Sequence, residues 1–278
     1  MEKSPERFEI LRKIDELEKQ GLFDKDVEVD PVGRELLPHE VDYLYKKFKS
    51  RVASRYAFYV ARKFMNKALK SKRLIISEIK GIENIDNVEG GAILTSNHFA
   101  AFDSFAMQIV YETSKNHKKR KMWRVIKEGN YTSFPGFYGL LMRHCNTLPL
   151  SSNYKTMQLF LGAIKEALKR GDLILLYPEQ SMWWNYRKPK PLKGGAFKFS
   201  YQNNVPIIPC FFTLEDSDII GDDGFPIQKY TAHILKPIYP DLTKPLKVAA
   251  QEMADKNYEL WKQVYEETYK IPLVYLNE

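Results

Sequence analysis

The 278-residue sequence has little cysteine, no long apolar run and no recognisable leader segment. Its two cysteines, Cys145 and Cys210, are too few for a disulfide framework, which favours a reducing compartment. No window contains eighteen consecutive apolar residues, so the sequence predicts no transmembrane helix. The first residues, Met1 to Glu6, lack the basic and then apolar pattern of a secretory signal peptide. Any contact with a membrane is therefore expected to be peripheral.

A further absence is local. Asp and Glu are missing from Tyr43 to Ser77, although the whole chain contains 35 acidic residues. The same stretch carries eleven Lys and Arg, which exceeds the net charge of +8 of the whole chain. Apolar side chains recur among these cations at about helical spacing: Tyr45, Phe48, Val52, Tyr56, Tyr59, Val60 and Phe64. A basic helix with an aromatic stripe is typical of a helix lying in an anionic lipid interface, where each cation contributes about 1 kcal/mol.

The same basic stretch also fits two alternatives. Most amphipathic helices pack their apolar face on the protein's own core and leave their charges in solvent, and both arrangements can hold for different faces. A basic segment also suits nucleic acid, but the sequence contains no nucleic-acid-binding motif and the charge accompanies an apolar stripe. We therefore expect an anionic membrane surface as a partner, and no nucleic acid.

Apolar runs alternate with amphipathic patterns along the chain, which predicts a mixed β-sheet flanked by helices in the α/β class. Strands are expected at or near residues 73–77, 91–96, 123–126, 146–150, 172–177, 206–214 and 230–235. Helices are expected at residues 5–19, 39–72, 104–112, 154–169 and 247–270. The length suits one sizeable core plus a small module. We divide the chain into an N-terminal helical, basic, membrane-associating region, 1–72, and an α/β domain, 73–278.

The stretch from Asn97 to Asp103 carries the strongest chemical signal. His98 follows a predicted strand, and Asp103 lies in the first turn of the following helix. A His in such a turn can fold back towards a first-turn carboxylate. That carboxylate fixes the imidazole tautomer through Nδ1–H and leaves Nε2 free to take a proton from a hydroxyl. The alternative is a core histidine beside an Asp that interacts with the helix dipole.

Three later segments extend this signal: Gly139–Arg143, Tyr177–Ser181 and Val205–Pro209. With the His-x4-Asp element they resemble, in type and order, the four motifs of the glycerolipid acyltransferase family, in particular the 1-acyl-sn-glycerol-3-phosphate acyltransferases. The resemblance covers roughly Leu74 to Pro240. It implies that His98 is the general base and that Asp103 orients it. It also implies that Arg143 binds the acceptor and that Lys193 helps to hold a phosphate. Glu179 would bind the acceptor's hydroxyl or organise neighbouring basic groups.

The resemblance further implies a glycerol-3-phosphate acyltransferase-like fold and an acyltransferase activity. A fatty acyl group would pass from acyl-CoA or acyl carrier protein to the free hydroxyl of 1-acylglycerol-3-phosphate, which gives phosphatidate in phospholipid biosynthesis. The thioester is then a co-substrate, no other cofactor is needed, and the protein would act at the cytoplasmic face of the cell membrane. The sequence lacks a Gly-x-Ser-x-Gly elbow and any His/Cys spacing for zinc, so we expect neither a serine nucleophile nor a metal.

The sequence departs from the family pattern at three positions. Ala100 stands where many relatives carry Ser, Gln180 where Gly is usual, and Met182 where Arg is usual. The last two changes bear on the acceptor and not on the type of reaction. Another lysophospholipid, a glycolipid or a hydroxylated lipid therefore stays open as the acceptor. A catalytically silent lipid-binding module is a further alternative, against which the retained His98 and Asp103 count.

Overall fold

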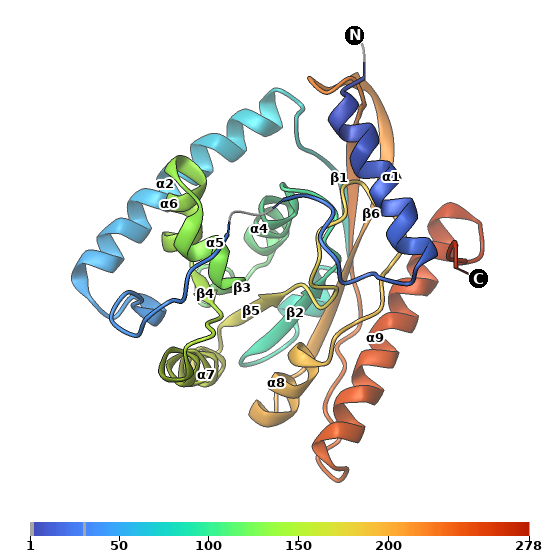
Figure 1. The fold of residues 1–278 in the computed structure, drawn as a ribbon. Coiled ribbons are helices and arrows are strands. Elements are labelled where there is room, and N and C mark those ends of the chain that lie inside the picture. Colours follow the sequence, from blue (N-terminus) through green and yellow to red (C-terminus); the bar gives the residue numbers. More distant parts are fainter. Residues whose placement is uncertain (1–2, 30–31, 278) are drawn as a thin grey trace.

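The computed structural model describes residues 3–29 and 32–277 of the chain. Its centre is a seven-stranded sheet with the order β1-β7-β6-β2-β5-β3-β4 (Figure 1). The strands are β1 (Ile75–Lys80), β2 (Ala92–Ser96), β3 (Met122–Ile126), β4 (Thr147–Pro149), β5 (Leu173–Leu176), β6 (Ile207–Ile220) and β7 (Pro226–Ile234). Strands β6 and β7 pair antiparallel, whereas the other neighbours in this sheet pair parallel, so the sheet is mixed, as predicted.

Helices join most of the strands. They are α1 (Pro5–Lys19), α2 (Phe48–Lys70), α3 (Glu83–Asp86), α4 (Asp103–Thr113), α5 (Glu128–Ser133), α6 (Gly136–His144), α7 (Tyr154–Lys169), α8 (Gly195–Asn203) and α9 (Leu246–Tyr269). The five predicted helices are confirmed, although α2 begins only at Phe48, after a short 3₁₀ turn at Tyr43–Tyr45. The sequence did not predict α3, α5, α6 and α8. The predicted strand at residues 206–214 is too short, because β6 continues to Ile220 and pairs there with the start of β7.

Both faces of the sheet are covered, which explains why its central strands are apolar at nearly every position. In β2, Leu94 belongs to one buried cluster and Ile93 to another, because successive side chains point to opposite faces. The face of Leu94 packs against α4 through Met107 and Val110. The opposite face is covered by α7, α8 and α9 (Figure 1).

Helix α2 divides its apolar stripe between the core and the surface. Phe64 packs against the rings of Phe102, Phe105 and Phe137, with ring centroids 6.1, 5.4 and 5.0 Å apart. Further towards the start of the helix, four apolar side chains are exposed: Phe48, Val52, Tyr56 and Tyr59. The stripe is therefore packed on the core near the end of the helix and open to solvent near its start. In the described part of the chain, no helix is long and apolar enough to cross a bilayer.

Helix α1 packs against a later part of the chain through its middle. Ile10 and Ile14 of α1 form a buried cluster with Phe23 and Trp183. The described residues 20–29 and 32–47, between α1 and α2, are called the connector below (Figure 1). The division at residue 72 stays a prediction.

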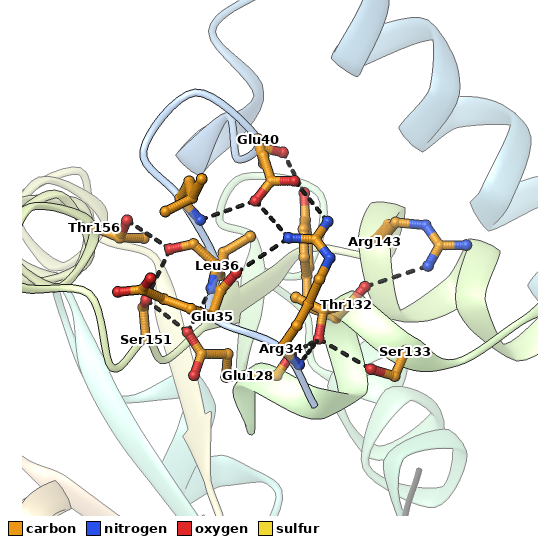
Figure 2. A network of polar contacts seen from close by, with 12 residues as sticks. Arg34, Glu35, Leu36, Glu40, Glu128, Thr132, Ser133, Arg143, Ser151 and Thr156 are labelled. Carbon is orange, nitrogen blue, oxygen red and sulfur yellow. Dashed lines mark hydrogen bonds and ion pairs between the residues drawn. The ribbon is translucent and has the colours of Figure 1, made fainter. Parts of the chain in front are cut away.

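The later part of this connector is fastened to α5 (Figure 2). Arg34 holds Glu40 through two hydrogen bonds of 2.8 and 2.6 Å. The Leu36 amide donates to the Glu128 carboxylate at 2.7 Å, and the Arg34 amide donates to the Thr132 hydroxyl at 3.3 Å. These bonds fix the path of the chain beside α5 and α6.

Strand direction decides where the functional residues meet. Strand β2 runs parallel to β5 on one side and to β6 on the other, with Thr95 opposite Leu176. The carboxyl ends of β2 and β5 therefore lie at the same edge of the sheet, as is usual for ligand sites in open α/β sheets. His98 and Glu179 follow these two ends, so the topology brings the first and third sequence motifs together.

Candidate active site

The turn after β2 is anchored by the Asn97 side chain. Its amide Nδ2 donates to the Phe212 carbonyl at 3.0 Å, and its Oδ1 accepts from the Phe212 amide at 2.8 Å. The side chain thus continues the β2–β6 pairing by one residue after the strand itself ends. This satisfies two buried backbone groups and sets the direction in which His98 leaves the sheet.

His98 and Asp103 are in direct contact. His98 Nδ1 and Asp103 Oδ2 form a hydrogen bond. Asp103 is the first residue of α4, and its side chain is 3% exposed, whereas the His98 side chain is 24% exposed. The carboxylate therefore holds Nδ1 as the protonated nitrogen, which leaves Nε2 as the basic atom of a partly accessible ring. The sequence predicted this pair, and the turn geometry produces it.

A third side chain, Tyr177, contacts both members of this pair. Its hydroxyl donates to Asp103 Oδ1 at 3.1 Å, and its ring lies against the imidazole with centroids 4.3 Å apart and planes 23° apart. Burial raises the pKa of Tyr177 well above its ordinary value, so the phenol stays protonated. In the sequence, Tyr177 was identified only as the first residue of a motif. Nothing in the local pattern predicted its contact with a residue 74 positions earlier.

Glu179 lies behind His98 and is buried. Its Oε2 accepts the His98 backbone N–H at 2.9 Å, and its Oε1 accepts the Lys190 backbone N–H at 2.8 Å. Burial raises the pKa of Glu179, while Lys190 and the two amides oppose this rise. In this structure the carboxylate therefore joins the turn of His98 to the loop that follows β5. Its predicted contact with an acceptor stays a prediction.

Lys190 is the buried cation of this loop. Its Nζ lies 3.8 Å from Glu179 Oε2 and donates to the carbonyl and hydroxyl oxygens of Ser181 at 2.6 and 2.8 Å. Burial lowers the pKa of Lys190 to about 8, against the opposing charge of Glu179. The sequence did not point to this residue, because a lysine between two prolines in a loop has no periodic signal. Its partners became visible only in the fold.

The side chains of Arg143 and Lys193 have partners other than His98 and Asp103. Arg143 Nη1 donates to the carbonyls of Tyr131 and Phe134 at 3.3 and 3.2 Å (Figure 2 draws the first of these bonds). The guanidinium lies back along α6, where a Cβ on Gly139 would approach Arg143 Nη2 within 2.5 Å. The same Cβ would lie 2.0 Å from the Phe134 carbonyl oxygen, so the glycine leaves room for this backbone group as well as for the guanidinium.

Lys193 makes an ion pair with Asp24 of the connector, with Nζ and Oδ2 2.9 Å apart. Its backbone amide donates to the Pro178 carbonyl, so it lies beside the third motif while its side chain points to the connector. A neighbouring cation behaves alike, because Lys127 Nζ donates to both oxygens of Asp26. The predicted binding roles of Arg143 and Lys193 stay predictions.

The departure at Gln180 has a conformational consequence. Its φ is +68°, in the left-handed region that favours glycine. Gln180 therefore adopts a conformation that glycine reaches without strain, and its side chain is exposed.

Neither cysteine is suited to act as a nucleophile. Burial raises the pKa of Cys145 to about 11, and it raises that of the fully buried Cys210 further. Both thiols are therefore protonated at neutral pH. Over residues 3–29 and 32–277, no group of three or more His, Cys, Asp and Glu side chains could hold a metal ion. The arrangement that remains is an imidazole base with a buried carboxylate behind it.

Comparison with known proteins gives a family match for part of the chain and a similar fold. Residues 76–213 match the family model described as Acyltransferase. The chain therefore contains an acyltransferase-family domain. Among solved structures, it is similar to the crystal structure of the 1-acyl-sn-glycerophosphate (LPA) acyltransferase PlsC from Thermotoga maritima. The TM-score is 0.54 at 18% sequence identity, over 83% of this chain and 87% of that one. A search of curated protein sequences finds no match.

The candidate site lies within the residues that match the family model. The matched residues begin in β1 and end in β6, so they include His98, Asp103, Tyr177 and Glu179. The likeness to PlsC extends over most of the chain and shows that the two proteins share a fold. The domain supports acyl transfer as the type of reaction, in agreement with the family resemblance of the sequence.

The buried pair of Glu179 and Lys190 leads to a pH-dependent prediction. In Lys190→Met, the Glu179 carboxylate loses its buried cation, so the free energy of unfolding at pH 7 is expected to fall by about 3 kcal/mol. Because the folded-state pKa of Glu179 is raised above 4.5, the folded protein takes up this proton at a higher pH than the unfolded chain. The loss is therefore expected to be smaller at pH 5 than at pH 7, because the raised pKa brings the protonation of Glu179 closer to the lower of the two pH values. Urea denaturation at the two pH values measures both effects.

Lys193→Met is the matched control, since it removes a lysine of the same loop whose ion pair with Asp24 is exposed. It is expected to stay close to the wild-type stability at both pH values. If Lys190→Met lowers the free energy of unfolding equally at pH 7 and pH 5, the charge of Lys190 does not compensate the charge of the Glu179 carboxylate.

Proposed function

We propose that the protein transfers a fatty acyl group from acyl-CoA or acyl carrier protein to the free hydroxyl of 1-acylglycerol-3-phosphate, giving phosphatidate in phospholipid biosynthesis. The observation that carries this proposal is the bond between His98 Nδ1 and Asp103 inside an acyltransferase domain. The name of the structurally similar PlsC, a 1-acyl-sn-glycerophosphate acyltransferase, supports the choice of acceptor.

The reaction needs one proton to move twice. His98 Nε2 takes the proton of the acceptor hydroxyl while that oxygen attacks the thioester carbon. The buried Asp103 carboxylate stabilises the imidazolium that forms. When the tetrahedral intermediate collapses, the C–S bond breaks and the sulfur takes the proton from Nε2, which releases a free thiol. No covalent acyl-enzyme is required, in keeping with the protonated state of both cysteines.

The base is tested directly by thiol release. With lysophosphatidate and an acyl thioester, His98→Gln is expected to lower kcat by about 10² to 10⁴-fold, because water replaces the positioned base. Asp103→Asn is expected to lower kcat as well, since a neutral amide stabilises the imidazolium less. A thiol assay on the purified variants measures both.

His39→Gln serves as the control, because His39 is an exposed histidine of the connector. It should retain the wild-type rate. Thiol release that persists unchanged in His98→Gln would remove His98 as the base.

A second class of acceptor is favoured by the internal partners of three cations, Arg143, Lys193 and Lys127. Arg143 is engaged by backbone carbonyls, and Lys193 and Lys127 are each paired with an aspartate of the connector. A phosphomonoester would have to compete with these internal partners, whereas a head group without one would not. Another lysophospholipid, a glycolipid or a hydroxylated lipid is therefore the alternative acceptor for the same chemistry.

A panel of acceptors separates the two candidates. If lysophosphatidate is the acceptor, replacing it by monoacylglycerol should lower kcat/KM at least about tenfold, because a charge-assisted phosphate contact is lost. If the alternative holds, the neutral acceptor should react at least as fast. The double substitution Asp24→Asn and Asp26→Asn should then shift the preference towards lysophosphatidate by about two- to fivefold. It removes the exposed carboxylates that pair with Lys193 and Lys127, so a phosphate no longer has to compete with these carboxylates for the two cations.

Glu28→Gln is the control for these substitutions, because its carboxylate pairs with Arg7 of α1. It should leave the acceptor preference unchanged. Equal preference in all variants would mean that the connector aspartates do not affect the head group.

The proposed place of action is the cytoplasmic face of the cell membrane, with the region 1–72 as the membrane-associating part. The exposed apolar residues Phe48, Val52, Tyr56 and Tyr59 of α2 support this proposal. Many of the eleven cations of the stretch 43–77 lie on the same helix. An anionic membrane suits such a surface, because apolar side chains enter the interface while the cations meet lipid head groups.

Vesicle sedimentation tests this surface. The triple substitution Val52→Ser, Tyr56→Ser and Tyr59→Ser is expected to weaken binding to phosphatidylglycerol-containing vesicles about tenfold, because it removes the apolar area that enters the interface. Higher salt should weaken the binding of the wild-type protein.

A matched triple substitution at exposed apolar residues outside α2 is the control: Tyr154→Ser, Tyr239→Ser and Leu242→Ser. It should bind like the wild type. Equal binding of both triple variants, or a preference for RNA over vesicles, would overturn the membrane assignment.

A further inference from the structure

The partner of Asp103 on the side away from His98 is a phenol. Asp103 Oδ2 contacts His98 Nδ1, and Asp103 Oδ1 accepts the Tyr177 hydroxyl at 3.1 Å. Tyr177 is in turn within 3.1 Å of the Ser104 hydroxyl. The carboxylate is buried, so each of its oxygens needs a donor from the protein. Tyr177 supplies the donor for the oxygen that the imidazole does not use.

The direction of these bonds follows from the chemistry of the groups. An ionised carboxylate only accepts hydrogen bonds, and a phenol has a single proton to give. The Tyr177 proton therefore goes to Asp103. The Ser104 hydroxyl must then donate its own proton to the Tyr177 oxygen. The result is a continuous series of donors, Ser104 to Tyr177 to Asp103, which ends on the carboxylate that also accepts from His98.

The same ring also restrains the imidazole. With centroids 4.3 Å apart and planes 23° apart, the Tyr177 ring lies nearly parallel to that of His98. One side chain thus sets the orientation of the carboxylate through its hydroxyl and the plane of the imidazole through its ring. Both settings affect the direction of Nε2, the atom that takes the proton in the proposed function.

The charged and titratable groups around this site come from four segments. Asp103 belongs to α4, Arg124 to β3 and Tyr230 to β7, and Glu179 and Lys190 belong to the loop after β5. Arg124 is a buried cation that donates to Gln108 of α4 and to the Cys145 carbonyl. Tyr177, which follows β5 directly, donates to Asp103 Oδ1.

We propose that Tyr177 is a positioning residue of the catalytic pair, which aligns the Asp103 carboxylate through its hydroxyl and the His98 ring through stacking. The inference rests on the proposed function in taking His98 as the base. It adds a residue whose hydroxyl acts through Asp103 without touching the substrate. Such a residue changes the rate of the chemical step and leaves the affinity for both substrates unaltered.

Tyr177→Phe tests the hydroxyl while it keeps the ring. The variant is expected to lower kcat about tenfold, the size of one lost hydrogen bond to a charged group, with KM for donor and acceptor unchanged. Its second readout is the far-downfield proton resonance of His98 Nδ1–H in NMR, assigned by its absence in His98→Gln. This resonance should move, because the carboxylate that accepts the proton has lost its other donor.

Ser104→Ala gives the graded control. It removes the donor to Tyr177 but keeps the bond from Tyr177 to Asp103, so it should lower kcat less and move the resonance less, in the same direction. Tyr201→Phe is the matched negative control, because the Tyr201 hydroxyl donates to the Lys244 carbonyl away from the site. It should retain the wild-type kcat and the wild-type resonance.

The two levels of the proposal fail in different ways. Wild-type protein that releases no thiol, or an active His98→Gln, refutes the proposed function, while the resonance still reports on Tyr177. An unchanged kcat and an unmoved resonance in folded Tyr177→Phe refute the positioning role. If circular dichroism shows that Tyr177→Phe is unfolded, Ser104→Ala decides, and wild-type values for that variant refute the role as well.

Discussion

The candidate site depends on the hydrogen bonds that the buried Glu179 carboxylate accepts from two backbone amides. The carboxylate accepts one backbone N–H from the turn after β2 and one from Lys190, in the loop after β5. A carboxylate without partners would be too costly to bury, but two amides and a nearby ammonium compensate the loss of water. The two segments are therefore held as one unit. The position of His98 is a consequence, because its own amide is one of the two donors.

The parallel pairing of β2 and β5 makes this contact possible. Parallel strands end at the same edge of the sheet, so the residues after Ser96 and after Leu176 are neighbours despite their distance in sequence. The antiparallel β6–β7 pair extends the sheet on the other side, and Asn97 continues the β2–β6 pairing into the turn. The backbone of the sheet thus sets the spacing of the side chains, and side-chain hydrogen bonds then fix their orientation.

Helix α2 shows how one amphipathic pattern can serve two environments. Phe64 packs among the rings of Phe102, Phe105 and Phe137, near the beginning of α4 and of α6. Tyr56 and Tyr59 lie in solvent on the same helix. The proposed membrane surface therefore lies on the same helix as a ring that packs beside the start of α4, where Asp103 lies. This placement suits an enzyme that takes a lipid acceptor from an interface.

Local sequence determined the strands, the long helices and the close approach of His98 to Asp103, because these depend on apolar periodicity and on a short spacing within one turn. The short helices α6 and α8 escaped prediction, since nine residues with glycines at their start carry little periodic signal. Only the tertiary structure decided the partners of Tyr177, Glu179 and Lys190. Hydrogen bonds between side chains far apart in sequence depend on strand order and register, which no local pattern encodes. The same reason explains why Arg143 and Lys193, identified by their motifs, have backbone and aspartate partners in the fold.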